Sequence, residues 1–227
     1  SLFLVFSLAI YLTVGNEIVD ALFQRGKTTS DDTTLIWLVL AAYSLGMPAR
    51  GSSRLLQNAR YAAGDVSGPA RIAALRVTVA AVIGIFAMFQ LDRYGLVDGD
   101  ISRLGDLPAF TPLPAEARSD GIVRLGAVGL ALGATVAAWL ELALLQQRVR
   151  NDLPRSPRAG GSMARLWVPA ALAGGVGLVV VATTASLPSL ITAGIACGAA
   201  GIVYLLAANV AGNRAAIEIM SPVLKRM

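Results

Sequence analysis

The sequence predicts an all-α fold, a polytopic bundle of six transmembrane helices. Only 15% of the 227 residues are charged, against 56% that are hydrophobic, whereas an ordinary soluble domain is about a quarter charged. Six apolar stretches approach the ~20 residues that a helix needs to cross a bilayer core of about 30 Å. Because lipid cannot hydrogen-bond to the backbone, these stretches are expected to be helices.

The first stretch, 2–14, continues in apolar residues to Phe23. The second, 35–49, extends as a more polar helix that ends near Ala63. The remaining four stretches are 72–91, 122–145, 166–185 and 190–210.

Residues with known preferences for helix ends support these boundaries. Residues 30–32 (Ser-Asp-Asp) offer N-cap oxygens to the second helix. Gly64-Asp65 is expected to end the polar extension, and Ser67-x-Pro69 to start the third helix. Leu187-Pro188 predicts a tight hairpin between the last two helices.

In the sixth helix, Gly194 and Gly198 form a G-x-x-x-G pattern that Gly201 extends. Such a pattern gives a flat face for close packing between helices. Plain packing is the favoured interpretation over specific dimerisation.

The charges alternate from loop to loop. The loops after the second and fourth stretches and the C-terminal tail are basic, whereas the loops on the other side carry balanced, acidic or no charge. Basic residues collect on the cytoplasmic side of a membrane. Six crossings with both chain ends in the cytoplasm fit this pattern.

The expected organisation follows from these segments. Residues 1–150 would form four transmembrane helices with an extracytoplasmic loop at 92–120, interpreted as a surface excursion with few core residues. Residues 151–165 would be a basic, flexible cytoplasmic linker, 166–212 a transmembrane hairpin and 213–227 a cytoplasmic tail. The chain begins inside an apolar run without signal-peptide features, so we expect a preceding part of the protein.

The composition argues against several classes of function. The chain has no His and only one Cys, Cys197, which disfavours metal sites and disulfides. No motif for nucleophilic catalysis or for phosphate cradling appears, so we expect neither an enzyme nor a cofactor. The net charge of +5 resides in the loops of a membrane chain, and therefore does not indicate nucleic acid.

Polar residues on the extension of the second helix form the first candidate site. Arg50, Arg54, Gln57 and Tyr61 recur at spacings that place them on one helix face. Such a stripe could line a cavity where guanidinium groups bind a diphosphate. The alternative is a solvated extension whose arginines contact lipid headgroups.

Glu141 is the second candidate. It precedes Arg148 by seven residues, which places it ~10 Å into the membrane. Glutamate is too short to reach the interface from there, so it needs a partner, a proton or a wet cavity. A role in substrate binding or coupling and a structural ion pair both remain open. Arg76, in the third helix, is expected to reach the interface with its long side chain.

Three blocks resemble the MurJ/MviN lipid II flippase family of the MOP superfamily. They are DALFQRGKTTSDDT with LAAYSLGMPA, LLQNARYAAGDVSGPARIA, and GAVGLALGATVAAWLELALLQQRVR. Within them, Arg60 stands where the family has Phe. The resemblance covers about residues 18–150. It implies that the chain corresponds to about helices nine to fourteen of such a transporter, which are a second-lobe fragment plus a C-terminal hairpin.

The resemblance implies transport of undecaprenyl-diphosphate-linked peptidoglycan precursor (lipid II) across the bacterial cytoplasmic (inner) membrane by alternating access. The implied partners are lipid II, membrane lipids and the missing N-terminal lobe of the same protein. Two alternatives remain: a MOP-type exporter of another polyprenyl-linked saccharide or of a drug, and a non-transporting membrane scaffold subunit.

Overall fold

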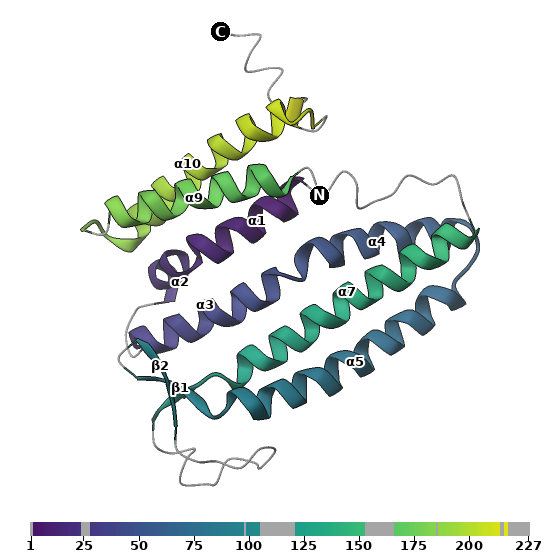
Figure 1. The fold of residues 1–227 in the computed structure, drawn as a ribbon, viewed down its shortest axis with the longest axis horizontal. Coiled ribbons are helices and arrows are strands. Elements are labelled where there is room, and N and C mark those ends of the chain that lie inside the picture. The colour runs from purple at the N-terminus through teal and green to yellow at the C-terminus, as the bar shows by residue number, and fades with distance from the viewer. Residues whose placement is uncertain are drawn as a thin grey trace. The chain divides into compact units, whose positions relative to one another are not determined.

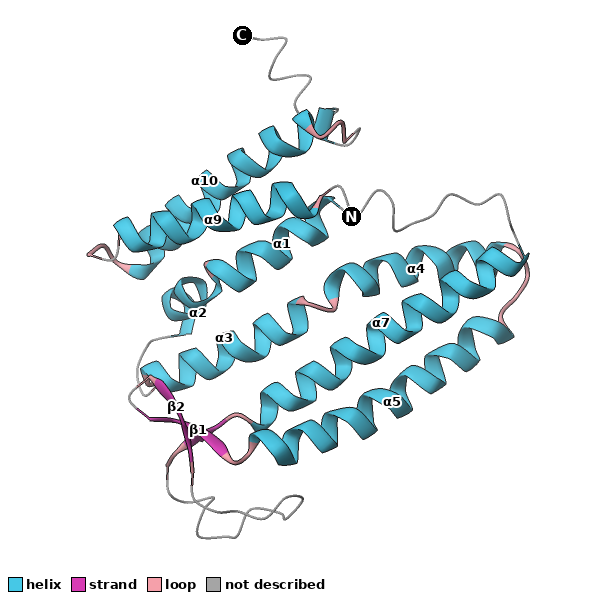
Figure 2. Ribbon diagram, in the orientation of Figure 1, coloured by secondary structure: helices cyan, strands magenta, loops and turns pink. Residues whose placement is uncertain are grey.

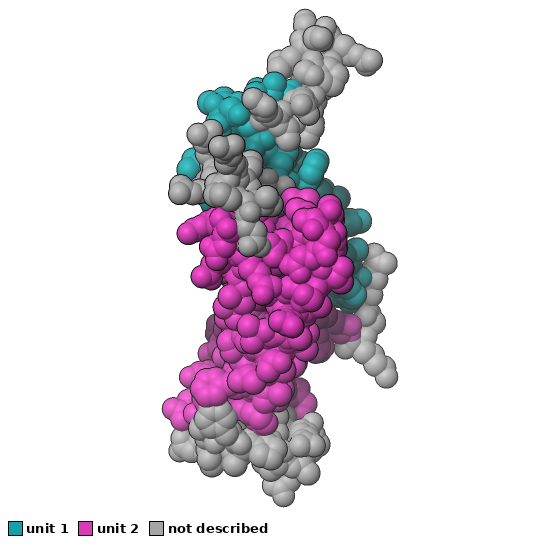
Figure 3. Space-filling model, turned by 90° about the vertical axis from the view of Figure 1, so that its right-hand side faces the viewer, with its two compact units in different colours: residues 1–23, 157–227 teal, residues 24–156 magenta. Residues whose placement is uncertain are grey.

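The computed structural model describes residues 2–23, 28–97, 99–104, 121–152, 166–184, 186–213 and 216–217. Helices dominate it (Figures 1 and 2). The chain divides into two compact units, coloured separately in Figure 3: one combines Ser1–Phe23 with Pro157–Met227, and the other is Gln24–Ser156. Most of the expected linker (153–165) and tail (214–215 and 218–227) lies outside the described residues. The expected domain boundaries stay predictions.

The described residues of the first unit form the helices α1 (Leu2–Thr13), α2 (Gly15–Phe23), α9 (Trp167–Thr183) and α10 (Ser189–Val210). The apolar stretch 2–23 was expected to form one helix, but it bends by 74° between α1 and α2. Pro188 precedes α10 with an extended ψ of 139°, so the hairpin expected at Leu187-Pro188 is present.

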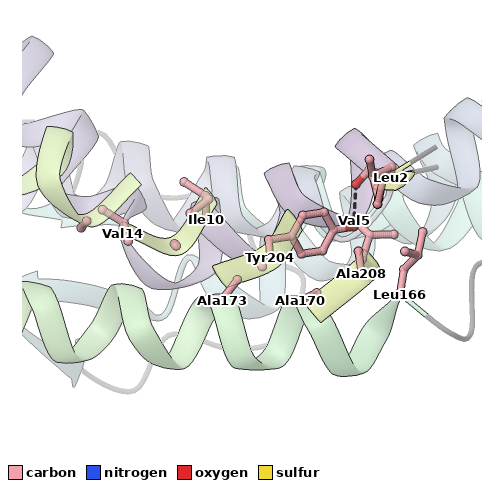
Figure 4. Packing of buried hydrophobic residues seen from close by; sticks show 13 residues of the cluster. Leu2, Val5, Ile10, Val14, Leu166, Ala170, Ala173, Tyr204 and Ala208 are labelled. Atoms are coloured by element: carbon pink, nitrogen blue, oxygen red, sulfur yellow. Dashed lines mark hydrogen bonds between the residues drawn. The ribbon is translucent and has the colours of Figure 1, made fainter. Parts of the chain in front are cut away.

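Small residues form the interior of this unit. Ala173, Ala196 and Ala200 are fully buried, and Tyr204 is the largest buried side chain (Figure 4). The hydroxyl of Tyr204 donates a hydrogen bond of 2.7 Å to the carbonyl oxygen of Leu2. Because a buried hydroxyl is costly without a partner, this bond fixes α10 against the start of α1.

The G-x-x-x-G pattern of α10 does not make the expected close contact within the described residues. A Cβ atom added at Gly194 or Gly198 would meet nothing within 4 Å, and one at Gly201 would make only an ordinary contact with Phe6. Alanines, not these glycines, provide the packed face of α10.

In the described part of the second unit, the helices are α3 (Ser30–Ser44), α4 (Met47–Ala62), α5 (Ser67–Leu91) and α7 (Gly126–Asp152), and three short strands accompany them. In Figure 1, α7 runs between α4 and α5. α3 begins with a capping box in which Thr29, one residue before the predicted cap, exchanges hydrogen bonds with Asp32. α5 begins at Ser67 with Pro69 in its first turn, as predicted.

The second apolar stretch breaks into α3 and α4 at Leu45-Gly46, where a continuous helix was expected. Pro48 lies in the first turn of α4 and has no N–H to continue the helical ladder. Two side chains of α7 bind carbonyl groups beside the break: Thr135 Oγ1 donates to Ala42 O at 2.6 Å, and Trp139 Nε1 to Leu45 O at 3.0 Å. The break is therefore anchored to α7.

α5 and α7 approach each other backbone to backbone. A Cβ atom at Gly133 would overlap the backbone of Gly84, and one at Gly129 would overlap the backbone of Ala87 and Met88. The glycines thus allow a close packing that no other residue would permit. We refer to Gly84, Gly129 and Gly133 as the glycine seam.

The expected loop 92–120 contains structure that the sequence did not predict. Strands β1 (Tyr94–Val97) and β2 (Asp100–Arg103) lie in this loop. With β3 (Val123–Arg124), which follows the loop, they form an antiparallel sheet in the order β2-β1-β3. Leu96 is buried, and the N–H of Gly99 donates to Asp31 Oδ1 at the start of α3. The hairpin is thus attached to the helices, while residues 105–120 lie outside the described part.

The helical, membrane-type bundle is confirmed. Among the described helices, α5, α7 and α10 are long and apolar enough to span a bilayer, and α1 with α2 could form a fourth, bent span. α9 is apolar but has 17 residues, and α3 and α4 have 15 and 16 residues. Length and composition therefore support three or four spans, fewer than the six predicted from hydropathy.

Candidate polar site on α4, α5 and α7

Glu141 is enclosed in the second unit and has two partners from different helices. Its side chain is 1% exposed. Arg76 Nη1 of α5 donates to Oε2 at 3.2 Å, and Gln57 Nε2 of α4 donates to Oε1 at 2.9 Å. Both carboxylate oxygens are thus occupied, and the carboxylate joins three helices. Its depth predicted a partner, a proton or a wet cavity, and the structure shows partners. The expectation that Arg76 reaches the interface missed this pairing.

Arg50 lies in the first turn of α4, directly after the break at Leu45-Gly46. Its guanidinium carbon lies 4.8 Å from the ring centroid of Tyr43, the penultimate residue of α3, in the range of a cation–π interaction. Its Nε atom is buried and has no hydrogen-bond partner in the part of the chain that the structure describes. No carboxylate there forms an ion pair with Arg50.

The structure brings together only part of the predicted stripe. Gln57 reaches Glu141, and the positive charge of Arg76 is near enough to act on Arg50. Arg54 and Tyr61, by contrast, are exposed on α4. The contribution of Tyr43 was missed, because its contact with Arg50 depends on the break between α3 and α4.

The cluster formed by Arg50, Gln57, Arg76 and Glu141 carries two guanidinium groups and one carboxylate. We call it the α4–α7 cluster. Glu141 neutralises Arg76, so the charge of Arg50 remains without an anion among the described residues. A partly buried guanidinium with an unpartnered Nε–H favours an oxyanion that it can bind in a bidentate way, such as a phosphate.

A second arrangement occupies the turn between α4 and α5. Gly64 ends α4 with a φ of +82°, a conformation suited to glycine. Asp65 accepts hydrogen bonds from the N–H of Gly68 at 2.9 Å and from Arg60 Nη2 at 2.5 Å. These two bonds hold the pKa of Asp65 below its usual range, and the bond from the N–H of Gly68 has the larger effect. Arg60 stands where the family that the sequence resembles has Phe. Its ion pair with Asp65 gives it a structural role in this turn.

Comparison with known proteins supports the resemblance for the N-terminal part of the chain. Residues 1–99 match the family model described as lipid II flippase MurJ. A probable lipid II flippase MurJ of Rhizobium tropici is 32% identical over 96 residues. That alignment covers 42% of this chain and 18% of the relative, so the chain matches a minor part of the relative's length. The resemblance is confirmed over residues 1–99, which include Arg50, Gln57 and Arg76 but not Glu141.

Proposed function

We propose, from the match of residues 1–99 to the lipid II flippase MurJ family, that the protein moves lipid II across the cytoplasmic membrane. The relative from Rhizobium tropici is named as a probable lipid II flippase too. The apolar helices identify a membrane protein. The family match is the observation that carries the proposal, and the α4–α7 cluster suggests how this part of the chain participates.

In the proposed mechanism, Arg50 contacts the diphosphate of the lipid carrier. Its guanidinium is held over Tyr43 and has a buried, unpartnered Nε. A diphosphate would supply the anion that the site lacks and form charge-assisted hydrogen bonds. Arg76 binds Glu141 in the structure, and a diphosphate arriving beside Arg50 would compete with Glu141 for it. The substrate charge would thereby alter the contacts among α4, α5 and α7, as alternating access requires.

One observation favours the scaffold alternative: Glu141 is in a closed ion pair, as expected for a purely structural residue. Arg50 and Arg54 are not in ion pairs among the described residues. The uncompensated charge of Arg50 therefore weighs toward an anionic substrate.

Depletion of the protein in its host tests the proposal. Lipid II should then accumulate in the inner leaflet, and its accessibility to an externally added, membrane-impermeant label should fall. Restoring the wild-type protein should restore labelling. Unchanged labelling during depletion would contradict flippase activity and favour the scaffold role.

A further inference from the structure

An open pocket of about 390 Å³ lies between the start of α5 and the end of α7, apart from the α4–α7 cluster. Arg71 and Arg148 line it from opposite helices, together with the amides Gln147 and Asn151. Its apolar wall includes Leu75 and Leu144. None of its described lining residues is acidic.

The spacing along each helix separates charge from hydrocarbon. Leu75 follows Arg71 by four residues in α5, and Leu144 precedes Arg148 by four residues in α7. Residues four apart lie on one helix face about 6 Å apart along the axis. Because α5 begins and α7 ends at this level, both leucines lie one turn deeper in the membrane-spanning part than their arginines.

The described side chains at this end of the unit carry a net positive charge, since Arg60, Arg71, Arg148 and Arg150 face one described carboxylate, Asp65. Asp65 lies beside Arg148 at Gly68 and its charge acts on Arg148, but its ion pair is with Arg60. Arg71 and Arg148 are exposed and form no ion pair within the described residues. Among the described residues, two guanidinium groups without an ion pair therefore lie together at one end of two apolar helices.

We propose that this pocket binds an anionic glycerophospholipid, such as phosphatidylglycerol, from the leaflet that faces the basic loops. The two arginines and the amides would bind the phosphate and the polar headgroup, and an acyl chain would lie against Leu75 and Leu144. This site is independent of the transport proposal, because its ligand is a bulk membrane lipid and its residues lie outside the α4–α7 cluster.

The test measures lipid binding by the intact protein in detergent. Phosphatidylglycerol or phosphatidylcholine with identical acyl chains is titrated in, and bound lipid is counted by native mass spectrometry. Phosphatidylglycerol should bind more tightly. Arg148→Gln or Arg71→Gln should weaken its binding about five-fold each, the effect expected for one arginine near an anionic lipid.

Arg150→Gln is the matched control, because Arg150 is exposed on the same helix but does not line the pocket. It should leave phosphatidylglycerol binding unchanged. An equal loss in this variant would show diffuse surface charge and overturn the proposal, as would equal binding of the two lipids. Arg71→Lys and Arg148→Lys, which keep the charge, provide the comparison should either glutamine variant unfold.

A third titration uses undecaprenyl diphosphate. Preferential binding of this lipid, lost in Arg71→Gln and Arg148→Gln, would overturn the phospholipid assignment and attribute the pocket to the carrier lipid. Failure of the flippase proposal would appear differently, as unchanged lipid II labelling in cells, and would not affect these titrations.

Discussion

Arg76 Nη1 donates to Glu141 Oε2 at 3.2 Å, yet the two side chains differ greatly in exposure, 37% for Arg76 against 1% for Glu141. An ion left unpaired in an apolar interior is costly, whereas an ion near water can be solvated. The buried carboxylate of Glu141 therefore depends on this ion pair more than the guanidinium of Arg76 does.

From this inequality, Arg76→Gln should destabilise the protein more than Glu141→Gln. The first change leaves a buried carboxylate with Gln57 alone and should cost about 3 kcal/mol. The second leaves an arginine that can turn toward water and should cost about 1 kcal/mol. Thermal unfolding in detergent, followed by tryptophan fluorescence, measures both, and the double variant should lose less than the sum. Equal losses would show that burial does not decide the energy of the pair.

Arg50→Gln should reduce lipid II transport by about ten-fold or more, because it removes a charge-assisted contact to the diphosphate. Arg50→Lys should be intermediate, since a lysine keeps the charge but lacks the planar fork. The measurement is outer-leaflet labelling of lipid II in cells that depend on the variant, at matched protein levels. Arg150→Gln serves as the control for loss of one positive charge and should transport normally.

Gly133→Ala should separate α5 from α7, because its Cβ atom would overlap the backbone of Gly84. Overpacking of this kind costs about 1–3 kcal/mol. Gly198→Ala is the matched control in α10, where a Cβ atom meets open space. The first variant should lower the unfolding temperature and the second should not. A comparable loss in both would indicate that helix backbone conformation, not the glycine seam, limits stability.

The free energy of unfolding should fall at acid pH in part because of Asp65. Its pKa is lowered in the folded protein by the N–H of Gly68 and by Arg60, so ionised Asp65 stabilises the fold above its unfolded pKa of about 3.9. This stabilisation is lost as the pH falls through the folded pKa.

Asp65→Asn should therefore lower the unfolding temperature near pH 6 and flatten its decline between about pH 5 and pH 2. Unfolding temperatures across this range, with Asp100→Asn in β2 as the control, measure the effect. An unchanged acid profile in Asp65→Asn would mean that other carboxylates cause the decline.

Local signals in the sequence predicted several of the helix ends, among them the start of α5. Ser67 and Pro69 identify the start of α5 because the preference for proline in a first turn is a property of the backbone alone. The break before Pro48 was missed, since the hydropathy of 35–49 is continuous across it. Its stabilisation comes from Thr135 and Trp139, more than 90 residues away in sequence.

The candidate site was predictable only in part for the same reason. The depth of Glu141 could be counted along its own helix, and this predicted a partner, a proton or a wet cavity. The identity of that partner depends on how α5 packs on α7. The G-x-x-x-G pattern was recognised in α10, whereas Gly129 and Gly133 of α7, with the same spacing, make the close contact. The strands of 94–103 were missed because each has only four residues, and β2 carries two charges among its four.

The glycine seam has a mechanical consequence. Where two helices touch through their backbones, sliding one along the other would drive side chains of α5 into the backbone of α7, and a packed interface resists such continuous deformation. α5 and α7 should therefore move as one rigid body. Flexing within the second unit would then concentrate at the break between α3 and α4. Thr135 and Trp139 of α7 bind carbonyl groups beside this break, so a displacement of α5 and α7 would reach Arg50 through them.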